Sequence, residues 1–422
     1  MNYISLFVGK AVILFMRLMG RNANTLPGLI IERINKKYLK DSLSKLEKGV
    51  IVVTGTNGKT TTTKILSSLL EGLGYRVLTN QTGGNYVRGV ISLVLDKSSW
   101  TNKLNYDIAI LELDEAHGVH FVNYFNPTGV VTLNILRDQM DRFGEIDKTA
   151  ELVKKIAKKA RSFVVINSND PRLSKMSNHL SSRIYWYGYA EELKDVFKSD
   201  DQHYDKNVKY FVEHKLDLSL ESYSKNTLNV KAEKSYQLPF NLSGSYNALN
   251  IVAALTALKA IEGKLDFAEI EKILSEIKPA FGRGEIIKLA NGAKIQLQLV
   301  KNPSGFNQSL SLVNENNFDK IGIVINDRYA DGRDVSWLYD TDFKNLKDNQ
   351  VFTSGIRYLD MAVRLKHQGI ESKKIEELRN FVEELIDLKE DQSAIIYCTY
   401  TAMLEVRRLL RKTGVSVEGV GL

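Results

Sequence analysis

The residues with the clearest chemical signature lie at Thr54–Thr63 (TGTNGKTTTT), between an apolar run and a helical stretch. Gly55 and Gly58 allow backbone N–H groups to turn inward around an anion, and Lys59 supplies a positive charge for the β- and γ-phosphates of a nucleotide. The Thr60 hydroxyl stands where such loops bind Mg²⁺. We therefore predict that the nucleotide is bound through Gly55, Thr56, Asn57, Gly58, Lys59, Thr60 and Thr61.

The elements around this loop alternate between strands and helices. Gly49–Thr54 is a continuous apolar, β-branched run, as expected of a strand that is buried on both faces. Similar runs follow at 106–113, 129–133 and 162–167, and a helical stretch spans 148–159. This alternation predicts a mostly parallel sheet covered by helices. A glycine turn capped by threonines is the alternative interpretation of the loop, and the strand–turn–helix context favours phosphate binding instead.

The rest of the chain indicates a second unit of the same α/β class. A helix is expected at Tyr246–Glu262, and a second series of apolar strands follows at 295–300, 321–325 and 394–398. Residues 190–240 are polar and tyrosine-rich, and we predict a small β-rich insert there. The predicted domains are an N-terminal helix and connection at 1–44, a nucleotide-binding domain at 45–288 and a C-terminal α/β domain at 289–422.

The composition is that of an ordinary globular protein. Of the 422 residues, 43% are hydrophobic and 26% are charged, which excludes a disordered chain and a multi-span membrane protein. The single cysteine, Cys398, excludes an intrachain disulfide and indicates the reducing cytoplasm. The net charge of +8 fits either an anionic substrate or a lysine-rich solvated surface. Since the basic residues are dispersed and no recognition motif accompanies them, we predict no nucleic-acid partner.

The N-terminal segment Ile4–Met16 is apolar apart from Lys10. It is shorter than the about 20 apolar residues that a membrane-spanning helix needs, and no small-residue cleavage site follows it. We expect an amphipathic helix that docks on the protein's own core. Contact with an anionic membrane surface is the alternative, and it would place the chain at the inner face of the cytoplasmic membrane.

Several segments resemble, in order, the Mur ligase superfamily, whose members use ATP to form an amide bond through an acyl phosphate. The loop GTNGKT at 55–60 is similar to the loop of that superfamily, and Leu111–Glu115 lies at a strand end where its members carry a Mg²⁺-binding glutamate. Ser245–Asn247 resembles the segment whose asparagine meets the adenine, and Gly282–Glu285 resembles the motif whose arginine reaches the γ-phosphate. The resemblance implies ATP and Mg²⁺ as cofactors, with Thr60 and Glu112 at the metal and Asn247 and Arg283 at the nucleotide.

A further segment, Asn134–Gly144 (NILRDQMDRFG), is similar to the superfamily's segment after the next strand. In the peptidoglycan-precursor ligases a histidine that helps to hold a second metal follows the aspartate. Here Gln139 follows Asp138, so that ligand is absent and the binding of a second metal stays open.

The C-terminal half resembles one family of this superfamily more specifically, the MurT family of synthetase subunits of lipid II isoglutaminyl synthase. The segments that carry this resemblance are Lys301–Asn307 (KNPSGFN), Asn326–Asp340 (NDRYADGRDVSWLYD), Thr353–Arg357 (TSGIR) and Tyr400–Glu405 (YTAMLE). The resemblance covers nearly the whole chain. It implies a Mur ligase-like central domain with a P-loop and a parallel sheet, followed by a Rossmann-like α/β domain.

The resemblance also implies a reaction shared between two proteins. A GatD-like glutaminase subunit releases ammonia from glutamine, and the chain uses ATP to activate the α-carboxyl of D-glutamate in the stem peptide of lipid II. Ammonia then gives D-isoglutamine. The implied partners are the glutaminase, in a heterodimer, and lipid II or a related precursor. This chemistry needs no nucleophilic side chain from this chain, only positioning and charge stabilisation. Cys398 is therefore expected to be a core residue.

An acidic residue in the segment Asn326–Asp340 is implied to complete the partner's catalytic triad by orienting its histidine. Asp334 is our first choice and Asp331 the second, and Asn326 and Trp337 lie near them in the sequence. The alternatives are a loop that only caps its own backbone groups and a loop that contacts ATP within the chain.

The sequence departs from the MurT family in one respect. Members of the family typically carry a four-cysteine zinc ribbon in the central domain, and the equivalent stretch, roughly 200–236, contains no cysteine. His203 and His214 alone cannot form a closed tetrahedral site. We therefore predict no structural zinc site.

Two other functions compete with this interpretation. One is a stand-alone ligase that adds an amino acid, as in folate polyglutamylation, and a comparison of nitrogen donors would distinguish it. The other is a scaffold protein that has kept nucleotide binding and lost turnover. The intact Lys59, Thr60, Glu112 and Arg283 argue against the scaffold.

Overall fold

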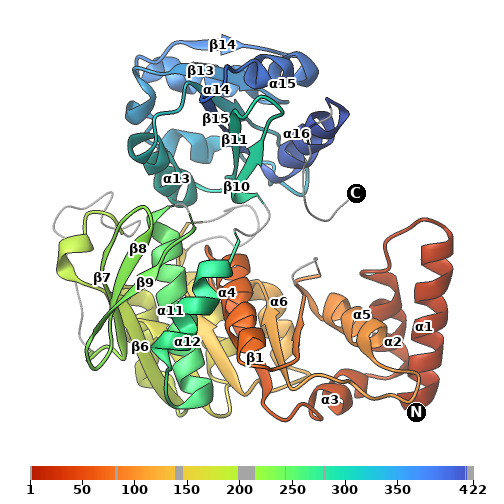
Figure 1. Ribbon diagram of the computed structural model, residues 1–422. Coiled ribbons are helices and arrows are strands. Elements are labelled where there is room, and N and C mark those ends of the chain that lie inside the picture. The colour runs from red at the N-terminus through yellow and green to blue at the C-terminus, as the bar shows by residue number, and fades with distance from the viewer. Residues whose placement is uncertain are drawn as a thin grey trace. The chain divides into compact units, whose positions relative to one another are not determined.

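The computed structural model describes residues 2–80, 84–137, 146–197, 214–242, 244–278, 282–413 and residue 415. The chain forms two compact units, each with a sheet of its own (Figure 1). The first unit comprises residues 1–135, 147–241 and 247–277, and the second comprises residues 136–146, 242–246 and 278–422.

The first unit contains a nine-stranded sheet in the order β2-β3-β1-β4-β5-β6-β7-β8-β9. Its strands are β1 (Gly49–Thr54), β2 (Val77–Thr79), β3 (Ile108–Glu112), β4 (Gly129–Thr132), β5 (Phe163–Asn167), β6 (Arg183–Tyr189), β7 (Leu218–Tyr223), β8 (Thr227–Lys231) and β9 (Ser235–Pro239). All pairs from β2 to β7 are parallel, and β8 and β9 join in antiparallel fashion. Val53 of β1 pairs with Glu112 of β3. The polar residues at the carboxyl ends of these two parallel strands therefore lie at the same edge of the sheet.

Helices cover this sheet. They are α1 (Asn2–Leu18), α2 (Leu26–Ile34), α3 (Tyr38–Leu43), α4 (Lys59–Gly72), α5 (Val87–Lys97), α6 (Glu115–Val122), α8 (Ile146–Ala157), α9 (Pro171–Met176), α11 (Ser245–Glu262) and α12 (Phe267–Glu276). The short 3₁₀ turns are η1 (Ser177–His179) and η2 (Glu191–Leu193). In α11 nearly every residue from Ala248 to Leu258 is buried, as expected of a helix that is apolar on all sides.

The N-terminal helices belong to this first unit, because α1 and α2 pack on α5. Gly28 of α2 permits this close approach, since a Cβ there would lie 1.9 Å from the carbonyl oxygen of Arg88. The backbone N–H of Gly28 donates to Ser92 Oγ at 2.8 Å. Among the described helices, none combines the length and the hydropathy that crossing a membrane requires.

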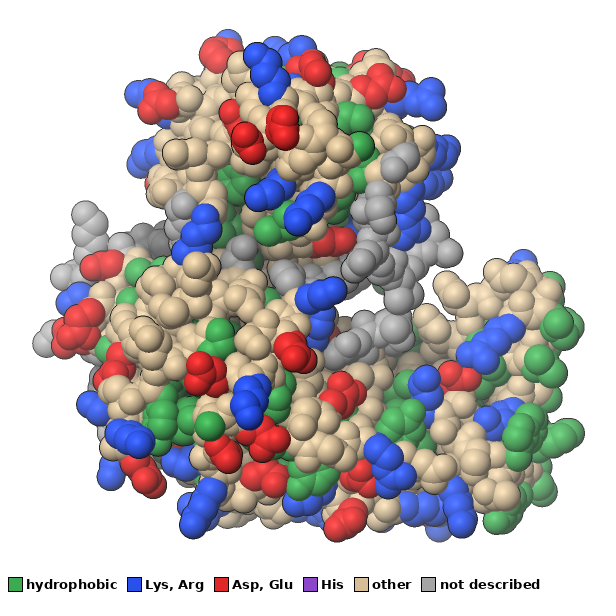
Figure 2. Space-filling view, viewed as in Figure 1, with side chains coloured by type: hydrophobic (Ala, Val, Ile, Leu, Met, Phe, Trp, Pro, Cys, Tyr) green, Lys and Arg blue, Asp and Glu red, His purple; other side chains and the backbone are tan. Residues whose placement is uncertain are grey.

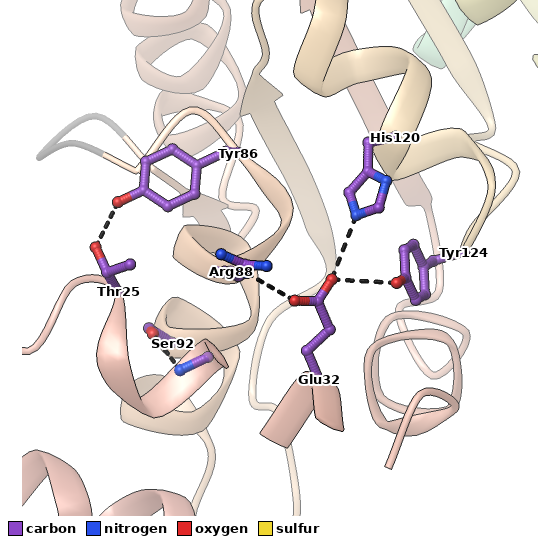
Figure 3. A network of polar contacts seen from close by, with 8 residues as sticks. Thr25, Glu32, Tyr86, Arg88, Ser92, His120 and Tyr124 are labelled. Carbon is purple, nitrogen blue, oxygen red and sulfur yellow. Dashed lines mark hydrogen bonds and ion pairs between the residues drawn. The ribbon is translucent and has the colours of Figure 1, made fainter. Parts of the chain in front are cut away.

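A buried carboxylate joins α2 to α5 and α6 (Figure 3). Glu32 accepts hydrogen bonds from Arg88 Nε at 2.7 Å and Tyr124 OH at 3.1 Å, and it lies 3.3 Å from His120 Nε2. Burial opposes ionisation of Glu32, but the bonds from Arg88, His120 and Tyr124 outweigh it and lower the pKa of the carboxyl.

The second unit contains a six-stranded sheet in the order β10-β11-β15-β12-β13-β14. Its strands are β10 (Arg283–Lys288), β11 (Lys294–Leu299), β12 (Lys320–Val324), β13 (Gln350–Ser354), β14 (Ser372–Lys374) and β15 (Ser393–Cys398). Only β10 pairs in antiparallel fashion. The helices are α13 (Pro303–Glu315), α14 (Tyr358–His367), α15 (Leu378–Ile386) and α16 (Tyr400–Lys412), with 3₁₀ turns η3 (Ser336–Asp340) and η4 (Lys344–Leu346).

Both faces of this second sheet are buried. Along β15, Ile396 and Cys398 enter one hydrophobic cluster, and Ile395 and Tyr397 enter another, because successive side chains of a strand point to opposite faces. This explains why the strand is a continuous apolar run in the sequence.

The structure differs from the sequence-based expectation at two places. The last and longest segment of the second unit begins at Lys278, earlier than the boundary that we placed after residue 288, because β10 pairs with β11. The described part of the expected β-rich insert is not a separate module. Its strands β7, β8 and β9 extend the large sheet from β6.

Candidate active site

The loop after β1 has the conformation of a phosphate-binding turn. Gly55 and Gly58 have φ angles of +127° and +89°, which favour glycine. A Cβ at Gly58 would also lie 2.3 Å from Asn250 Oδ1, so a side chain at this position would have to displace Asn250. The helix α4 begins directly at Lys59, and its first backbone N–H groups therefore face the loop.

Lys59 lies folded over this loop. Its Nζ donates to the backbone carbonyls of Gly55 and Thr56, the latter at 3.1 Å. The ammonium group that is expected to bind the phosphates therefore also holds two residues of the loop together.

Asn134, which follows β4, fixes the other side of the loop. Its side-chain Oδ1 accepts from Asn57 N at 2.8 Å, and its Nδ2 donates to Asn57 O at 3.0 Å. Its backbone carbonyl accepts from Thr56 N at 3.0 Å. One residue thus satisfies three backbone groups of Thr56 and Asn57.

The carboxylate of Glu112 lies beside the loop, at the end of β3. It accepts a hydrogen bond from Thr60 Oγ1 at 3.0 Å and another from Asn85 Nδ2 at 3.0 Å. The backbone of Glu112 is held on both sides by Asn80, whose Oδ1 accepts from the N–H at 2.9 Å and whose Nδ2 donates to the carbonyl at 2.8 Å. Thr60 and Glu112, predicted to share a metal ion, are therefore adjacent.

Asn247, at the start of α11, belongs to the same unit as the loop. It is buried, and its Oδ1 lies 3.3 Å from Asn250 Nδ2. Asn250 in turn lies against Gly58, so the two asparagines link α11 to the phosphate loop.

The chemical types of these residues suit the binding of a nucleoside triphosphate and Mg²⁺. The glycine turn, the helix N-terminus and Lys59 all favour an anion. A hydroxyl and a carboxylate in contact, as at Thr60 and Glu112, are hard oxygen ligands suited to Mg²⁺. The buried Thr61 hydroxyl has no hydrogen-bond partner among the described residues.

In the second unit, polar side chains converge where β12, β13 and β15 end. Asn326, just after β12, is buried and bridges the two neighbouring segments. Its Nδ2 donates to Thr401 Oγ1 at 3.0 Å, and its Oδ1 accepts from Ile356 N at 3.0 Å. Its backbone N–H donates to Thr399 Oγ1 at 2.9 Å.

The two aspartates of this region have different surroundings. Asp331 is buried and accepts from Thr401 N at 2.7 Å and Thr401 Oγ1 at 2.5 Å. Asp334 is exposed and accepts one bond from the nearby Ser336 N at 2.8 Å. Asp331 therefore holds the loop to α16, whereas the carboxylate of Asp334 faces the surroundings.

The other predicted residues of the second unit have structural contacts of their own. Trp337 is half-buried, and its ring lies 6.2 Å from that of Phe306. Arg283 begins β10 and is half-buried, next to Glu285, which forms an ion pair with the buried Arg407 of α16.

The chain matches two family models, the Mur ligase middle domain at residues 53–258 and the MurT ligase C-terminal domain at residues 299–403. It is 31% identical to a protein of Streptococcus pneumoniae named lipid II isoglutaminyl synthase (glutamine-hydrolyzing) subunit MurT, over 96% of each chain. The chain belongs to the MurT family. The Staphylococcus aureus protein of the same name is 28% identical over 84% of this chain and 85% of its own.

Solved structures confirm the Mur ligase fold that we predicted for this MurT-family chain. MurF ligase from Thermotoga maritima, solved in complex with ADP, aligns with a TM-score of 0.67 at 16% identity over 90% of this chain and 83% of its own. Folylpolyglutamate synthase from Mycobacterium tuberculosis, with ADP and AMPPCP, aligns with a TM-score of 0.60 at 18% identity over 88% and 93%.

Two predictions, on the second metal and on the cysteine-free insert, concern residues outside the described ranges. Asp138 and Gln139 lie there, as does His203, so the second metal and the zinc-free insert stay predictions. In the described part, His214 stacks on Trp186 with ring centroids 3.8 Å apart. Cys398 is fully buried, as predicted, and burial strongly raises the pKa of its thiol.

Sequence analysis missed the asparagines that brace the site. Asn80, Asn85 and Asn250 were not singled out, and Asn134 was noted only as the start of a motif. Only Asn250 had a local signal, because it follows Asn247 by one helical turn. The others act through pairings across the sheet, such as Asn80 with Glu112.

Proposed function

We propose that the chain is the synthetase subunit of a lipid II isoglutaminyl synthase. In this reaction an α-carboxylate oxygen of D-glutamate in the stem peptide attacks the γ-phosphorus of ATP, and ADP leaves. Ammonia then attacks the acyl carbon, loses a proton and displaces phosphate, which gives D-isoglutamine. The observation that carries the proposal is the 31% identity to a named MurT subunit over 96% of both chains.

The geometry of the first unit supports the ATP step. The backbone N–H groups of the phosphate loop and Lys59 are placed to bind the β- and γ-phosphates. Thr60 and Glu112 would hold Mg²⁺, which when bound supplies charge stabilisation for phosphoryl transfer. Asn247 is assigned to the adenine and Arg283 to the γ-phosphate, roles that rest on the resemblance of their motifs.

The geometry of the second unit supports a partner subunit. An exposed carboxylate, Asp334, is available to orient a histidine of a GatD-like glutaminase, whereas Asp331 is held by Thr401. Exposed apolar side chains adjoin this edge: Ile356, Leu359 and Val363, the last two one turn apart on α14. Such a surface suits a protein interface.

We also assign the substrate and the location by chemistry. The acceptor is lipid II or a related precursor, which is anchored in the membrane, so we place the chain in the cytoplasm at the inner membrane face. ATP is available on that side, and the single cysteine fits a reducing compartment.

The test is amidation of lipid II by the chain co-purified with its glutaminase, with either glutamine or ammonium as the nitrogen source. We expect Asp334→Asn to lower glutamine-driven turnover by roughly 100-fold and to leave ammonium-driven turnover nearly unchanged. Lys59→Ala should abolish both, because it removes the phosphate charge.

One control variant and two outcomes define the limits of the proposal. Asp331→Asn should lower the thermal unfolding midpoint, since one of the two carboxylate oxygens that accept from Thr401 becomes an amide NH₂ group. Glutamine-driven turnover that survives Asp334→Asn would refute the role of Asp334. Efficient use of an amino acid in place of ammonia would favour the stand-alone ligase instead.

A further inference from the structure

Helix α1 has two apolar faces, and the described part of the chain covers only one of them. Leu6, Gly9 and Ile13 are buried, and Gly9 lies so close to α5 that a Cβ would be 2.5 Å from Leu95 Cδ2. The opposite face consists of exposed large apolar side chains at helical spacing. They are Tyr3, Ile4, Phe7, Leu14, Phe15 and Leu18.

Trp100 continues this outer face, and we call these seven exposed residues the α1 patch. Trp100 is 66% exposed and Leu18 is 78% exposed. The rings of Phe7 and Trp100 lie 6.5 Å apart, and Tyr3, Ile4, Leu6, Phe7 and Trp100 line a surface hollow of about 400 Å³. Figure 2 shows the apolar side chains gathered along α1. A contiguous patch of large apolar side chains marks an interaction surface.

The charge around the α1 patch identifies its partner. Residues 2–40 contain seven basic residues and one acidic residue, an excess of six out of the net +8 of the whole chain. The single acid, Glu32, is buried in its network with Arg88. Most of the excess positive charge of the chain therefore lies in this N-terminal segment. Two acids also contact α1, since Arg17 forms an ion pair with Asp96 at 2.8 Å and Asn2 donates to Asp41 at 3.0 Å. The basic residues are Lys10, Arg17, Arg21, Arg33, Lys36, Lys37 and Lys40.

We propose that the α1 patch docks the protein on an anionic lipid bilayer. An apolar helix face with Trp, Tyr and Phe, flanked by Lys and Arg, enters the boundary between headgroups and acyl chains. The adjacent basic residues add electrostatic attraction to anionic headgroups. Lys10 suits this depth, because its Nζ lies 5.2 Å from the centre of the Trp100 ring and a lysine can keep its charge at the headgroup level while its stem is buried.

The proposal deepens the proposed function by naming the surface that reaches the membrane, but its test needs neither ATP nor lipid II. The full chain is mixed with vesicles of phosphatidylcholine that contain about 30 mol% phosphatidylglycerol, and bound protein is measured by flotation. We expect binding at least about tenfold stronger than to pure phosphatidylcholine, and weaker binding at high salt.

Paired variants separate the apolar and the electrostatic parts. Phe7→Ser with Phe15→Ser should lower vesicle affinity by at least about tenfold, since two aromatic side chains that would be buried in the bilayer are lost. The matched control, Val196→Ser with Ile286→Ser, removes exposed apolar side chains elsewhere and should bind as the wild type does. Arg21→Glu with Lys37→Glu should remove the preference for phosphatidylglycerol.

Three outcomes would overturn the proposal. They are no flotation of the wild type, wild-type affinity of the Phe7 and Phe15 variant, and self-association of the wild type that this variant abolishes without any vesicle binding. The last would assign the patch to a second copy of the chain. Since all substituted side chains are exposed, unchanged thermal unfolding midpoints confirm that the variants fold.

Discussion

Gly58 and Gly74 have nearly the same backbone angle but different surroundings. Their φ values are +89° and +90°, so both lie in the left-handed region. A Cβ at Gly58 would collide with Asn250 Oδ1, whereas a Cβ at Gly74 would meet nothing within 4 Å. The pair therefore separates the cost of backbone strain from the cost of a blocked phosphate loop.

We predict that Gly58→Ala weakens ATP binding by at least about tenfold, because the loop must shift away from Asn250. Gly74→Ala should cost about 1 kcal/mol of unfolding free energy and leave ATP affinity unchanged. Titration with a fluorescent ATP analogue measures the first effect, and thermal unfolding measures the second. Equal ATP affinities of the two variants would contradict the assigned role of the loop.

The different surroundings of Asp331 and Asp334 could not be predicted from the sequence. Both lie in one polar loop, and sequence ranked Asp334 first only by resemblance. The distinction comes from Thr401, 70 residues further along the chain, which holds Asp331. Such a pairing depends on the parallel order of β12 and β15.

At the scale of elements, the Glu32 network fixes α2 against α5 and α6. Glu32 is nearly buried and holds Arg88, His120 and Tyr124 together, so three segments separated in sequence share one carboxylate. The network and the close packing at Gly28 both hold α2 against α5, the first through polar contacts and the second through backbone contact.

We predict that Glu32→Gln lowers the unfolding free energy at pH 7 by about 1 kcal/mol, since charge-assisted bonds are lost. The pKa of Glu32 is lowered in the folded protein. Its stabilisation is therefore present above the unfolded carboxyl pKa and is lost as pH falls through the folded value. Unfolding midpoints of the two proteins should converge in acid, and a difference that widens there would contradict this.

Sequence patterns predicted the elements unevenly. Buried parallel strands such as Gly49–Thr54 were predicted almost to the residue, because both faces are apolar. The strand β6 (RIYWYGY) was missed because it begins with the exposed Arg183 and alternates only partly buried residues with buried ones. The strand β2 was missed because it has only three residues. The insert strands were recognised as β-rich, but nothing local indicates that they extend the large sheet.

At the scale of the molecule, the sequence predicted two α/β units with Mur ligase character, and the comparisons confirm that fold. The boundary between the units was harder to predict, because β10 (RGEIIK) carries three charged residues and is assigned to the second sheet only by its pairing with β11. For α1 we expected an amphipathic helix docked on the core, and the helix does pack on α5. Its second, exposed apolar face was not predicted, since the apolar segment Ile4–Met16 gives no sign of which of its side chains are covered.

We predict that the Cys398 thiol does not react with an aromatic disulfide reagent at pH 8 in the native protein and reacts fully in denaturant. The thiol is fully buried, and burial raises its pKa, so the reactive thiolate is scarce. Ser44→Cys, at an exposed position, is the control and should react at once. Rapid reaction of the native wild type would mean that the core of the second unit opens readily.

This buried thiol has a practical consequence for the study of motion. A pair of new cysteines at exposed positions, Ser44 in the first unit and Lys347 in the second, can carry a donor and an acceptor dye without removal of the natural residue. Energy transfer between the dyes would then follow how the distance between the units responds to ATP. Because Cys398 is buried in the core of the second unit, only the two new cysteines would be labelled.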